Sequence, residues 1–190
     1  MPVIDHFSLL APIYERLIPL REPEKFIRIA ALPVNGVILD AGGGTGRVAK
    51  AVKQYAQNTI VADLSLGMLR QIVPDFGLGA VNSQTEWLPF ESETFERVIM
   101  IDALHHVIDH QQTAGELWRV LKPGGRLIIG EPDVRKLIVK FVALGEKLAL
   151  MRSHFIDPTS IAALFKDRAA QVKINQDGFN TWVVVDRLKT

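Results

Sequence analysis

The sequence contains no cysteine among its 190 residues. Disulfide bonds, zinc–thiolate sites and thiol nucleophiles are therefore excluded. Charge of one sign is not in excess either, because 22 basic and 21 acidic side chains give a formal net charge of +1. A nucleic-acid-binding surface usually carries a strong basic excess. We therefore do not expect DNA or RNA as a partner.

Long hydrophobic runs are also missing. Charged residues interrupt every apolar stretch well before the roughly 20 residues that a membrane span requires. The first residues, Met1 to His6, lack the basic segment and apolar core of a secretory signal, so we expect a cytoplasmic protein. The length of 190 residues and the hydrophobic content of 48% suit a single domain with one sizeable core.

Short runs rich in valine and isoleucine alternate with segments of helical periodicity, which is typical of βαβ units around a parallel sheet. The sequence predicts helices over about 46–56, 65–73 and 109–121, with Lys122-Pro-Gly-Gly125 ending the last one because proline cannot continue a helix. The predicted strands in this region are 37–39, 59–62, 79–82, 97–101 and 126–130.

The two ends of the domain have a different character. Residues 1–33 contain two predicted helices, 7–17 and 23–31, and form a lid or a packing arm ahead of the core at 34–131. Residues 132–190 begin with a long amphipathic helix over 134–152, which could cover a substrate, meet another subunit or pack on the sheet. The rest of this part is predicted to hold a helix from 158 to about 166, capped by Thr159 or Ser160, and strands 171–175 and 181–187 around a turn at Gly178.

A glycine-rich loop follows the first predicted strand. Asp40 closes that strand, and Gly42, Gly43, Gly44 and Gly46 follow it. Glycine tolerates positive φ and lets a ligand approach the backbone, and the next helix presents unpaired N–H groups. The loop is therefore predicted to bind a nucleoside-bearing cofactor, whereas an ordinary turn would need only one glycine. A dinucleotide site would require G-x-G-x-x-G, and Arg47 occupies the place of its last glycine.

Asp63 ends the second predicted strand. The carboxyl ends of neighbouring parallel strands meet, so this carboxylate can accept hydrogen bonds from both hydroxyls of a cofactor ribose. It could instead cap the following helix, a role that Ser65 could also fill. Leu64 and Met68 stand close by in the sequence and are included among the expected cofactor contacts.

Several segments together resemble class I S-adenosylmethionine-dependent methyltransferases, in particular the quinone C-methyltransferases of menaquinone and ubiquinone biosynthesis. The similarity is strong over 37–131 and weak over 7–17. In that group, the segment equivalent to 7–17 covers the site. The matching stretches are Asp40-x-Gly-x-Gly-x-Gly46, Gln84-Thr-Glu-Trp-Leu-Pro-Phe90, Ile101-Asp-Ala-Leu-His-His-Val107 and Glu116-Leu-Trp-Arg-Val-Leu-Lys-Pro-Gly-Gly125.

This resemblance implies a doubly wound, Rossmann-like three-layer α/β sandwich with a mostly parallel seven-stranded sheet whose last strand is antiparallel. It implies S-adenosylmethionine as cofactor, which leaves as S-adenosylhomocysteine. Asp40 would hold the ammonium of the methionine portion, and the glycines would lie under the ribose and the amino-acid part. Gln84 replaces the acid that usually meets adenine and Thr85 replaces an alanine, although a glutamine carbonyl can still accept a hydrogen bond.

Candidates for a proton-accepting or orienting role come from two places. Asp102, also an expected cofactor contact, and His106 follow the fourth strand, beside the point where the strand order reverses. Tyr14 would border the cofactor from the N-terminal lid, or pack within an amphipathic helix. The neighbouring His105 could pack or cap instead. Histidines 105, 106 and 110 with Asp109 have poor spacing for a metal, so no metal site is expected.

The predicted reaction is methyl transfer to a small, apolar or aromatic acceptor, by a monomer or a homodimer. Holding donor and acceptor in near-attack geometry can supply most of the rate enhancement, and the sequence does not single out one base. An NAD-dependent oxidoreductase would share the glycine loop and Asp63, but the glycine spacing and the Leu-Pro-Phe segment oppose it. A non-catalytic S-adenosylmethionine-binding protein stays open because of Gln84.

Overall fold

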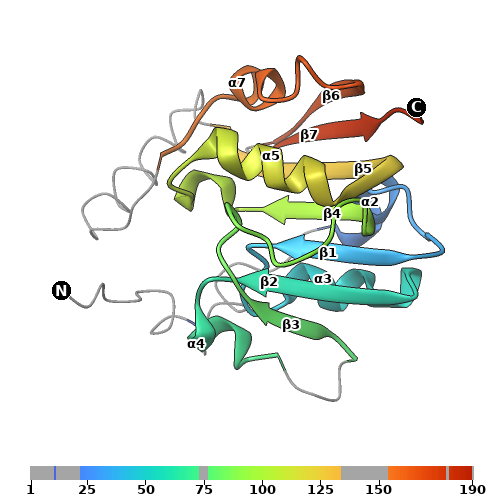
Figure 1. Ribbon diagram of the computed structural model, residues 1–190, viewed down its shortest axis with the longest axis vertical. Coiled ribbons are helices and arrows are strands. Elements are labelled where there is room, and N and C mark those ends of the chain that lie inside the picture. Colours follow the sequence, from blue (N-terminus) through green and yellow to red (C-terminus); the bar gives the residue numbers. More distant parts are fainter. Residues whose placement is uncertain (1–10, 12–21, 73–76, 134–153, 179, 190) are drawn as a thin grey trace.

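The computed structural model describes residue 11 and residues 22–72, 77–133, 154–178 and 180–189. Seven strands of this part form one sheet in the order β3-β2-β1-β4-β5-β7-β6 (Figure 1). The predicted seven-stranded sheet is therefore confirmed. The strand bounds are β1 Val37–Ala41, β2 Asn58–Asp63, β3 Gly79–Asn82, β4 Phe95–Ile101, β5 Leu121–Pro132, β6 Ala170–Asp177 and β7 Asn180–Arg187.

The strand directions also agree with the prediction. β1 pairs in parallel with β2 and β4, and parallel pairing continues to β3 on one side and to β5 on the other. β7, the last strand of the chain, is antiparallel to β5 and to β6. The order of the strands reverses between β1 and β4, and ligands of such doubly wound sheets bind at the carboxyl ends on either side of that point.

Helices cover both faces of the sheet. In the view of Figure 1, α5 lies in front of the sheet, whereas α2 and α3 lie behind it. The bounds are α2 Pro23–Ile29, α3 Arg47–Val52, α4 Leu66–Leu69, α5 His110–Val120 and α7 Pro158–Ala163, with short 3-10 turns η1 Lys53–Tyr55 and η3 Leu104–His106. Among the described residues, no helix is both long and apolar enough to cross a bilayer.

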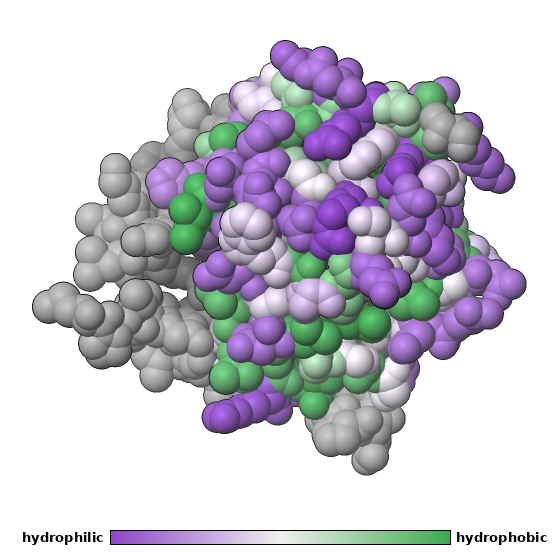
Figure 2. All heavy atoms as spheres, viewed as in Figure 1, coloured by the Kyte–Doolittle hydropathy of each residue, from purple (hydrophilic) through white to green (hydrophobic). Residues whose placement is uncertain are grey.

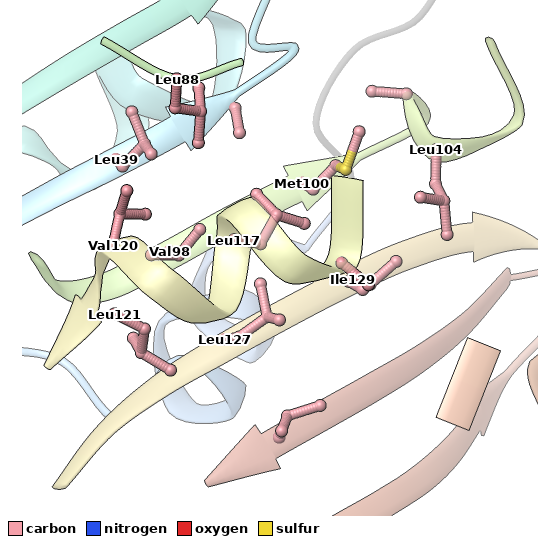
Figure 3. Packing of buried hydrophobic residues seen from close by; sticks show 14 of the residues in the cluster. Leu39, Leu88, Val98, Met100, Leu104, Leu117, Val120, Leu121, Leu127 and Ile129 are labelled. Carbon is pink, nitrogen blue, oxygen red and sulfur yellow. The ribbon is translucent and has the colours of Figure 1, made fainter. Parts of the chain in front are cut away.

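The period-2 alternation of each central strand explains the layers. Leu39, Val98 and Leu127 belong to the cluster under α5, while the adjacent Ile38 and its equivalents in β4 and β5 pack against α2 and α3. Figure 3 shows α5 placing Leu117 and Val120 over this first cluster. Because both faces are apolar, the strands read as nearly continuous runs of valine, isoleucine and leucine.

The front layer does not extend over the whole sheet. Figure 2 shows hydrophobic residues over β1, β2 and β3, below α5. The connection from β3 to β4, residues 83–94, contributes only Leu88 to the buried cluster on this side, with Phe90 packed against it. Ile60 of β2 and Val81 of β3 are therefore only half-buried.

The predicted helix over 23–31 is confirmed as α2, which packs as an arm behind the sheet. Phe26 is buried against Trp182 of β7, with ring centroids 5.6 Å apart. Two arginines of the sheet bind the carbonyls at the end of α2: Arg97 Nε donates to Ala30 O at 2.6 Å, and Arg126 Nη1 donates to Ile29 O at 2.8 Å. These bonds satisfy acceptors that a helix leaves open at its carboxyl end.

Several boundaries differ from the sequence prediction. The helix expected over 65–73 is the shorter α4, Leu66–Leu69. The helix expected over 46–56 is α3 followed by the tighter 3-10 turn η1, a common way for a helix to end. The cap of α7 is Asp157, which accepts the amides of Thr159 and Ser160, because Pro158 occupies the first helical position. β5 already begins at Leu121. The predicted helices 7–17 and 134–152 lie outside the described residues.

Candidate functional site

The glycine loop leaves β1 at the carboxyl edge of the sheet. Gly42, Gly44 and Gly46 adopt φ of 70°, 56° and 77°, which is the left-handed region that side chains disfavour. Gly43 needs its missing side chain for a different reason, because a Cβ there would lie 2.6 Å from Asp40 Cγ. Each glycine of the glycine-rich loop is thus required either by its backbone conformation or by close packing.

Asp40 lies beneath this loop and is 1% exposed. Its Oδ2 accepts the amide of Ala49 in α3 at 3.1 Å. Burial raises the pKa of Asp40 to about 7, although the bond from Ala49 and the charge of Arg47 act in the opposite direction. The carboxyl group thus ties the loop to α3. Its expected contact with the ammonium of a methionine portion stays a prediction.

Asp63 ends β2 and holds the backbone on either side of it. Its Oδ2 accepts the amide of Gly44 at 2.8 Å, and its Oδ1 accepts the amide of Ser65 at 2.8 Å. A carboxylate offers about four lone-pair positions. The contact of Asp63 with ribose hydroxyls stays a prediction. The helix cap is formed by Ser65, as the sequence allowed, because its Oγ accepts the amide of Met68.

The space above Gly44 fits a ligand. An ideal Cβ at Gly44 would have Asp63 Oδ2 and Met68 Sδ as its nearest atoms, both at 4.0 Å. Met68 is buried, whereas Leu64 is 64% exposed. A carboxylate, a thioether and an open glycine therefore surround one position at the carboxyl edge, where the ribose of a nucleoside cofactor would lie.

The segment after β3 joins this edge through hydrogen bonds to the backbone of β2. Ser83 N donates to Asp63 O at 3.0 Å. Asn82 pairs with Asp63 across the sheet, and the exposed Gln84 stands two residues after Asn82. Thr85 and Glu86 are buried, and Glu86 Oε1 accepts the amide of Ile108 at 2.8 Å. Glu86 thus holds this loop to the segment after η3, and Gln84 and Trp87 are exposed side chains of the segment.

Asp102 occupies the carboxyl end of β4 with φ of 53°, an uncommon conformation for a residue with a side chain. Arg47, the residue that excludes a dinucleotide fingerprint, donates from Nη2 to Asp102 Oδ2 at 3.0 Å. Burial raises the pKa of Asp102, and the carboxylate of Glu131 raises it further, while Arg47 lowers it. The first residue of α3 and the end of β4 are joined here across the reversal point of the sheet.

Glu131, which the sequence reasoning did not single out, lies beside Asp102 on β5 and is 4% exposed. Its Oε1 accepts the amides of Ala103 at 3.1 Å and Leu104 at 2.7 Å, and its Oε2 lies 2.5 Å from His105 Nδ1. A signal was available, because Glu131 ends a buried strand as Asp40 and Asp63 do. His105 is buried, whereas His106 is half-buried beside it, with ring centroids 4.0 Å apart.

The structure thus gathers most of the predicted residues at one edge. Asp40, the glycines, Asp63, Met68 and Asp102 come together there, and a Cβ at Gly42 would lie 2.7 Å from Ala103 Cβ, so the loop after β4 touches the glycine loop. Tyr14 lies outside the described residues. Within the described part of the chain, no group of three or more histidine, aspartate or glutamate side chains is arranged to hold a metal.

Comparison with known proteins shows which family the chain resembles. Residues 39–129 match the methyltransferase domain family. The chain is 35% identical over 139 residues to the ubiquinone/menaquinone biosynthesis C-methyltransferase of Syntrophotalea carbinolica, covering 66% of this chain and 59% of that relative. It is 36% identical over 107 residues to the demethylmenaquinone methyltransferase of Clavibacter sepedonicus, covering 54% and 44%. The chain therefore spans about half the length of these relatives.

Solved structures agree on the fold. A SAM-dependent methyltransferase from Thermotoga maritima superposes with a TM-score of 0.76 at 19% identity, over 95% of this chain and 98% of that one. Another from Aquifex aeolicus gives a TM-score of 0.68 at 17% identity, over 94% and 95%. The matched domain and the relatives identify residues 39–129 as a methyltransferase domain; the chain resembles the quinone C-methyltransferase group of the class I S-adenosylmethionine-dependent methyltransferases, and S-adenosylmethionine is the implied cofactor.

Proposed function

We propose that this chain transfers the methyl group of S-adenosylmethionine to a small aromatic acceptor of the hydroquinone type. The observation that carries the donor half is the position above Gly44, bordered at 4.0 Å by Asp63 Oδ2 and Met68 Sδ. When bound, the cofactor supplies an electrophilic methyl on a sulfonium sulfur. The chain's own residues bind and orient it.

Each residue of the edge has a defined task in this proposal. Asp63 accepts from the ribose hydroxyls while it keeps the amides of Gly44 and Ser65. Gln84 offers its side-chain carbonyl to the amino group of adenine. The loop at Asp102 fixes the end of β4 next to the methionine portion. Most of the rate enhancement then comes from positioning, because the leaving thioether needs no proton.

The acceptor half is supported by the relatives, whose names describe methylation in quinone biosynthesis. A hydroquinone ring is electron-rich, so a ring carbon can attack the methyl once a hydroxyl proton is lost. Phe155 and the two histidines after β4 provide flat rings close to the carboxyl edge. These residues are proposed as part of the acceptor surface. The roles expected of Tyr14 and of the helix over 134–152 stay predictions, because both lie outside the described residues.

Two measurements test the proposal. Titration calorimetry should show binding of S-adenosylmethionine and S-adenosylhomocysteine, and none of NAD. Transfer of a labelled methyl group to a panel of hydroquinones, simple phenols and aliphatic carboxylates should then show product with the hydroquinones. Binding without transfer to any member of the panel would favour the non-catalytic alternative, and binding of neither sulfur compound would refute the donor half as well.

A further inference from the structure

The ion pair between Arg47 and Asp102 joins the glycine loop to the end of β4. Arg47 directly follows Gly46, and its Nη2 donates to Asp102 Oδ2 at 3.0 Å. The loop after β4 also touches the other end of the glycine loop, because a Cβ at Gly42 would lie 2.7 Å from Ala103 Cβ. The pair therefore lies at the reversal point of the sheet, where ligands of doubly wound folds bind.

Arg47 and Asp102 have hydrogen-bonding capacity that they do not use with each other. A guanidinium carries five N–H donors, and a carboxylate has about four acceptor positions. Among the contacts of the described residues, the bond between Nη2 and Oδ2 is the one hydrogen bond that either side chain makes. The side chains are 11% and 24% exposed, and none of their polar atoms is both buried and without a partner. Their unused donors and acceptors are therefore open to solvent at this edge.

Asp102 is held in an unusual conformation, and its charge is only partly compensated. Its φ of 53° is uncommon for a residue with a side chain, and its N–H donates to Gly130 O at 2.9 Å. Such conformations cluster at ligand-binding sites. Burial raises the pKa of Asp102, and the carboxylate of Glu131 raises it further, while Arg47 lowers it. A second cation beside Asp102 would therefore stabilise its charged form.

The amino-acid end of S-adenosylmethionine has the charges that such a pair can bind. It carries a carboxylate and an ammonium on the same carbon. A guanidinium binds a carboxylate through parallel N–H bonds, and a carboxylate accepts hydrogen bonds from an ammonium. Asp40, which the resemblance assigns to the ammonium, is 1% exposed and accepts the amide of Ala49. Asp102 is the more accessible carboxylate, and it lies next to a cation that can take the other charge of the zwitterion.

We infer that Arg47 binds the carboxylate and Asp102 the ammonium of the methionine portion, so that the pair selects ligands with an α-amino-acid end. The inference rests on the donor half of the proposed function and adds the residues that determine its specificity. Adenine nucleosides without the amino-acid end would leave both side chains with unused hydrogen-bonding groups, and a site built for such bonds rejects a ligand that lacks them. The residue that excludes a dinucleotide fingerprint thereby gains a binding role of its own.

A series of four ligands tests the inference on the wild-type protein by calorimetry. The series comprises S-adenosylhomocysteine, its analogue without the carboxylate, its analogue without the amino group, and methylthioadenosine, which lacks the whole amino-acid end. Removal of either charged group should weaken binding about 10- to 100-fold, as expected for hydrogen bonds to charged groups. Equal affinity for all four ligands would overturn the inference. Failure of all four to bind would instead refute the donor half of the proposed function.

Two variants assign each charge of the ligand to its partner. Arg47→Gln should no longer distinguish S-adenosylhomocysteine from the analogue without the carboxylate, and Asp102→Asn should no longer distinguish it from the analogue without the amino group. Both should keep the affinity for methylthioadenosine within about twofold, because that ligand makes neither contact. Arg47→Lys, which keeps the charge but not the fork of donors, should restore part of the preference. A loss for methylthioadenosine as large as that for S-adenosylhomocysteine would mean that the pair only shapes the loop, and would overturn the inference.

The matched control is Arg126→Gln at the amino edge of the sheet. Arg126 is also a strand-end arginine paired with an aspartate, because its Nε and Nη2 donate to Asp186 at 2.6 and 3.0 Å. This variant removes the same kind of ion pair and changes the net charge by the same amount. It should bind the four ligands with the affinities and the ranking of the wild type. The same loss of preference in Arg126→Gln as in Arg47→Gln would trace the effect to net charge or stability, and would overturn the inference.

Discussion

The carboxylates at the two edges of the sheet are used in different ways. At the carboxyl edge, Asp40, Asp63 and Glu131 accept backbone amides at the starts of loops or helices. At the amino edge, Glu96 pairs with Lys122, and Asp186 receives Arg126 at 2.6 and 3.0 Å. The second edge is neutralised by cations. At the first, cations bind Asp102 and Asp177, through Arg47 and Lys25, whereas Asp40 and Asp63 are held by backbone amides.

This difference predicts that the carboxylates of the amino edge contribute to stability and those of the carboxyl edge to ligand binding. Surface ion pairs such as Glu96 with Lys122, whose side chains are 23% and 42% exposed, contribute roughly 0–1 kcal/mol. Amides at the carboxyl edge hold backbone loops in shape without cancelling the charge of the carboxylates. Carboxylates held in this way suit the sulfonium and the ammonium of the proposed cofactor. The two kinds of carboxylate therefore predict variants with different phenotypes.

Gly44→Val should have the largest effect. The new Cβ would lie in the space bordered by Asp63 Oδ2 and Met68 Sδ, where we place the ribose, and φ of 56° strains a β-branched residue. We expect calorimetry to detect no binding of S-adenosylmethionine by a protein that keeps its circular dichroism spectrum.

Gly178→Val is the matched control for backbone strain. Gly178 has φ of 57° in the turn between β6 and β7, and a Cβ there meets nothing within 4 Å. Both variants should lose about 1–2 kcal/mol of stability, but Gly178→Val should bind the cofactor normally. Normal binding by Gly44→Val would show that the loop is misassigned.

Asp63→Ala comes next. It should weaken binding of S-adenosylhomocysteine by about 1.5–3 kcal/mol, the range for hydrogen bonds to a charged group. Because Asp63 also holds the amides of Gly44 and Ser65, the variant alone mixes two causes. A cycle with the 2′-deoxy analogue of the ligand separates them. The wild type should lose affinity when the hydroxyl is removed, and Asp63→Ala should not discriminate. Equal discrimination by both proteins would restrict Asp63 to its loop contacts.

Much of the fold could be predicted because the signals are local. The valine and isoleucine runs at β1, β2 and β4 need burial on both faces, and a parallel sheet covered by helices is the arrangement that supplies it. Ser65 caps its helix as the sequence allowed, and Asp109, where the sequence places the start of a helix, is the cap of α5. The cap of α7 was predicted too late in the chain because the sequence reading took Pro158 to precede the helix, whereas it is the first helical residue. β5 was predicted too short because its first residue, Leu121, pairs with Phe95, and the sequence does not show such a long-range contact.

The donor side of the site could be predicted for the same reason. Asp40, the glycines and Asp63 follow strands within a few residues, so chain order places them together. The contacts of the acceptor side depend on geometry across strands: Arg47 reaches Asp102 over 55 positions, and Glu131 reaches back to His105 over 26. Residue type marked Asp102 as a candidate, but which of the two histidines contacts a carboxylate depends on side-chain direction, which the sequence does not contain.

Asp40→Asn tests how the buried carboxyl group of Asp40 affects the pH dependence of the free energy of unfolding. Burial raises the pKa of Asp40 to about 7 in the folded chain, from the 3.8 of an exposed aspartate. Between these values the folded state binds more protons than the unfolded state, so Asp40 makes the free energy of unfolding fall as pH rises from about 4 to about 7. Urea unfolding across this range should show a flatter pH dependence in Asp40→Asn. The same slope in both proteins would mean that another group causes it.

The amino edge should give the smallest effects. Glu96→Gln removes the charge facing Lys122 but leaves a carbonyl that can accept the amide of Val37, which Glu96 Oε2 now accepts at 2.6 Å. We expect a loss of no more than about 1 kcal/mol in the free energy of unfolding, and this loss should shrink in 1 M salt because the ion pair is partly exposed. Cofactor affinity should not change, since Glu96 lies at the opposite end of β4 from Asp102. A loss of affinity in this variant would mean that the two edges are coupled through β4, and that the division between stabilising and ligand-binding carboxylates does not hold.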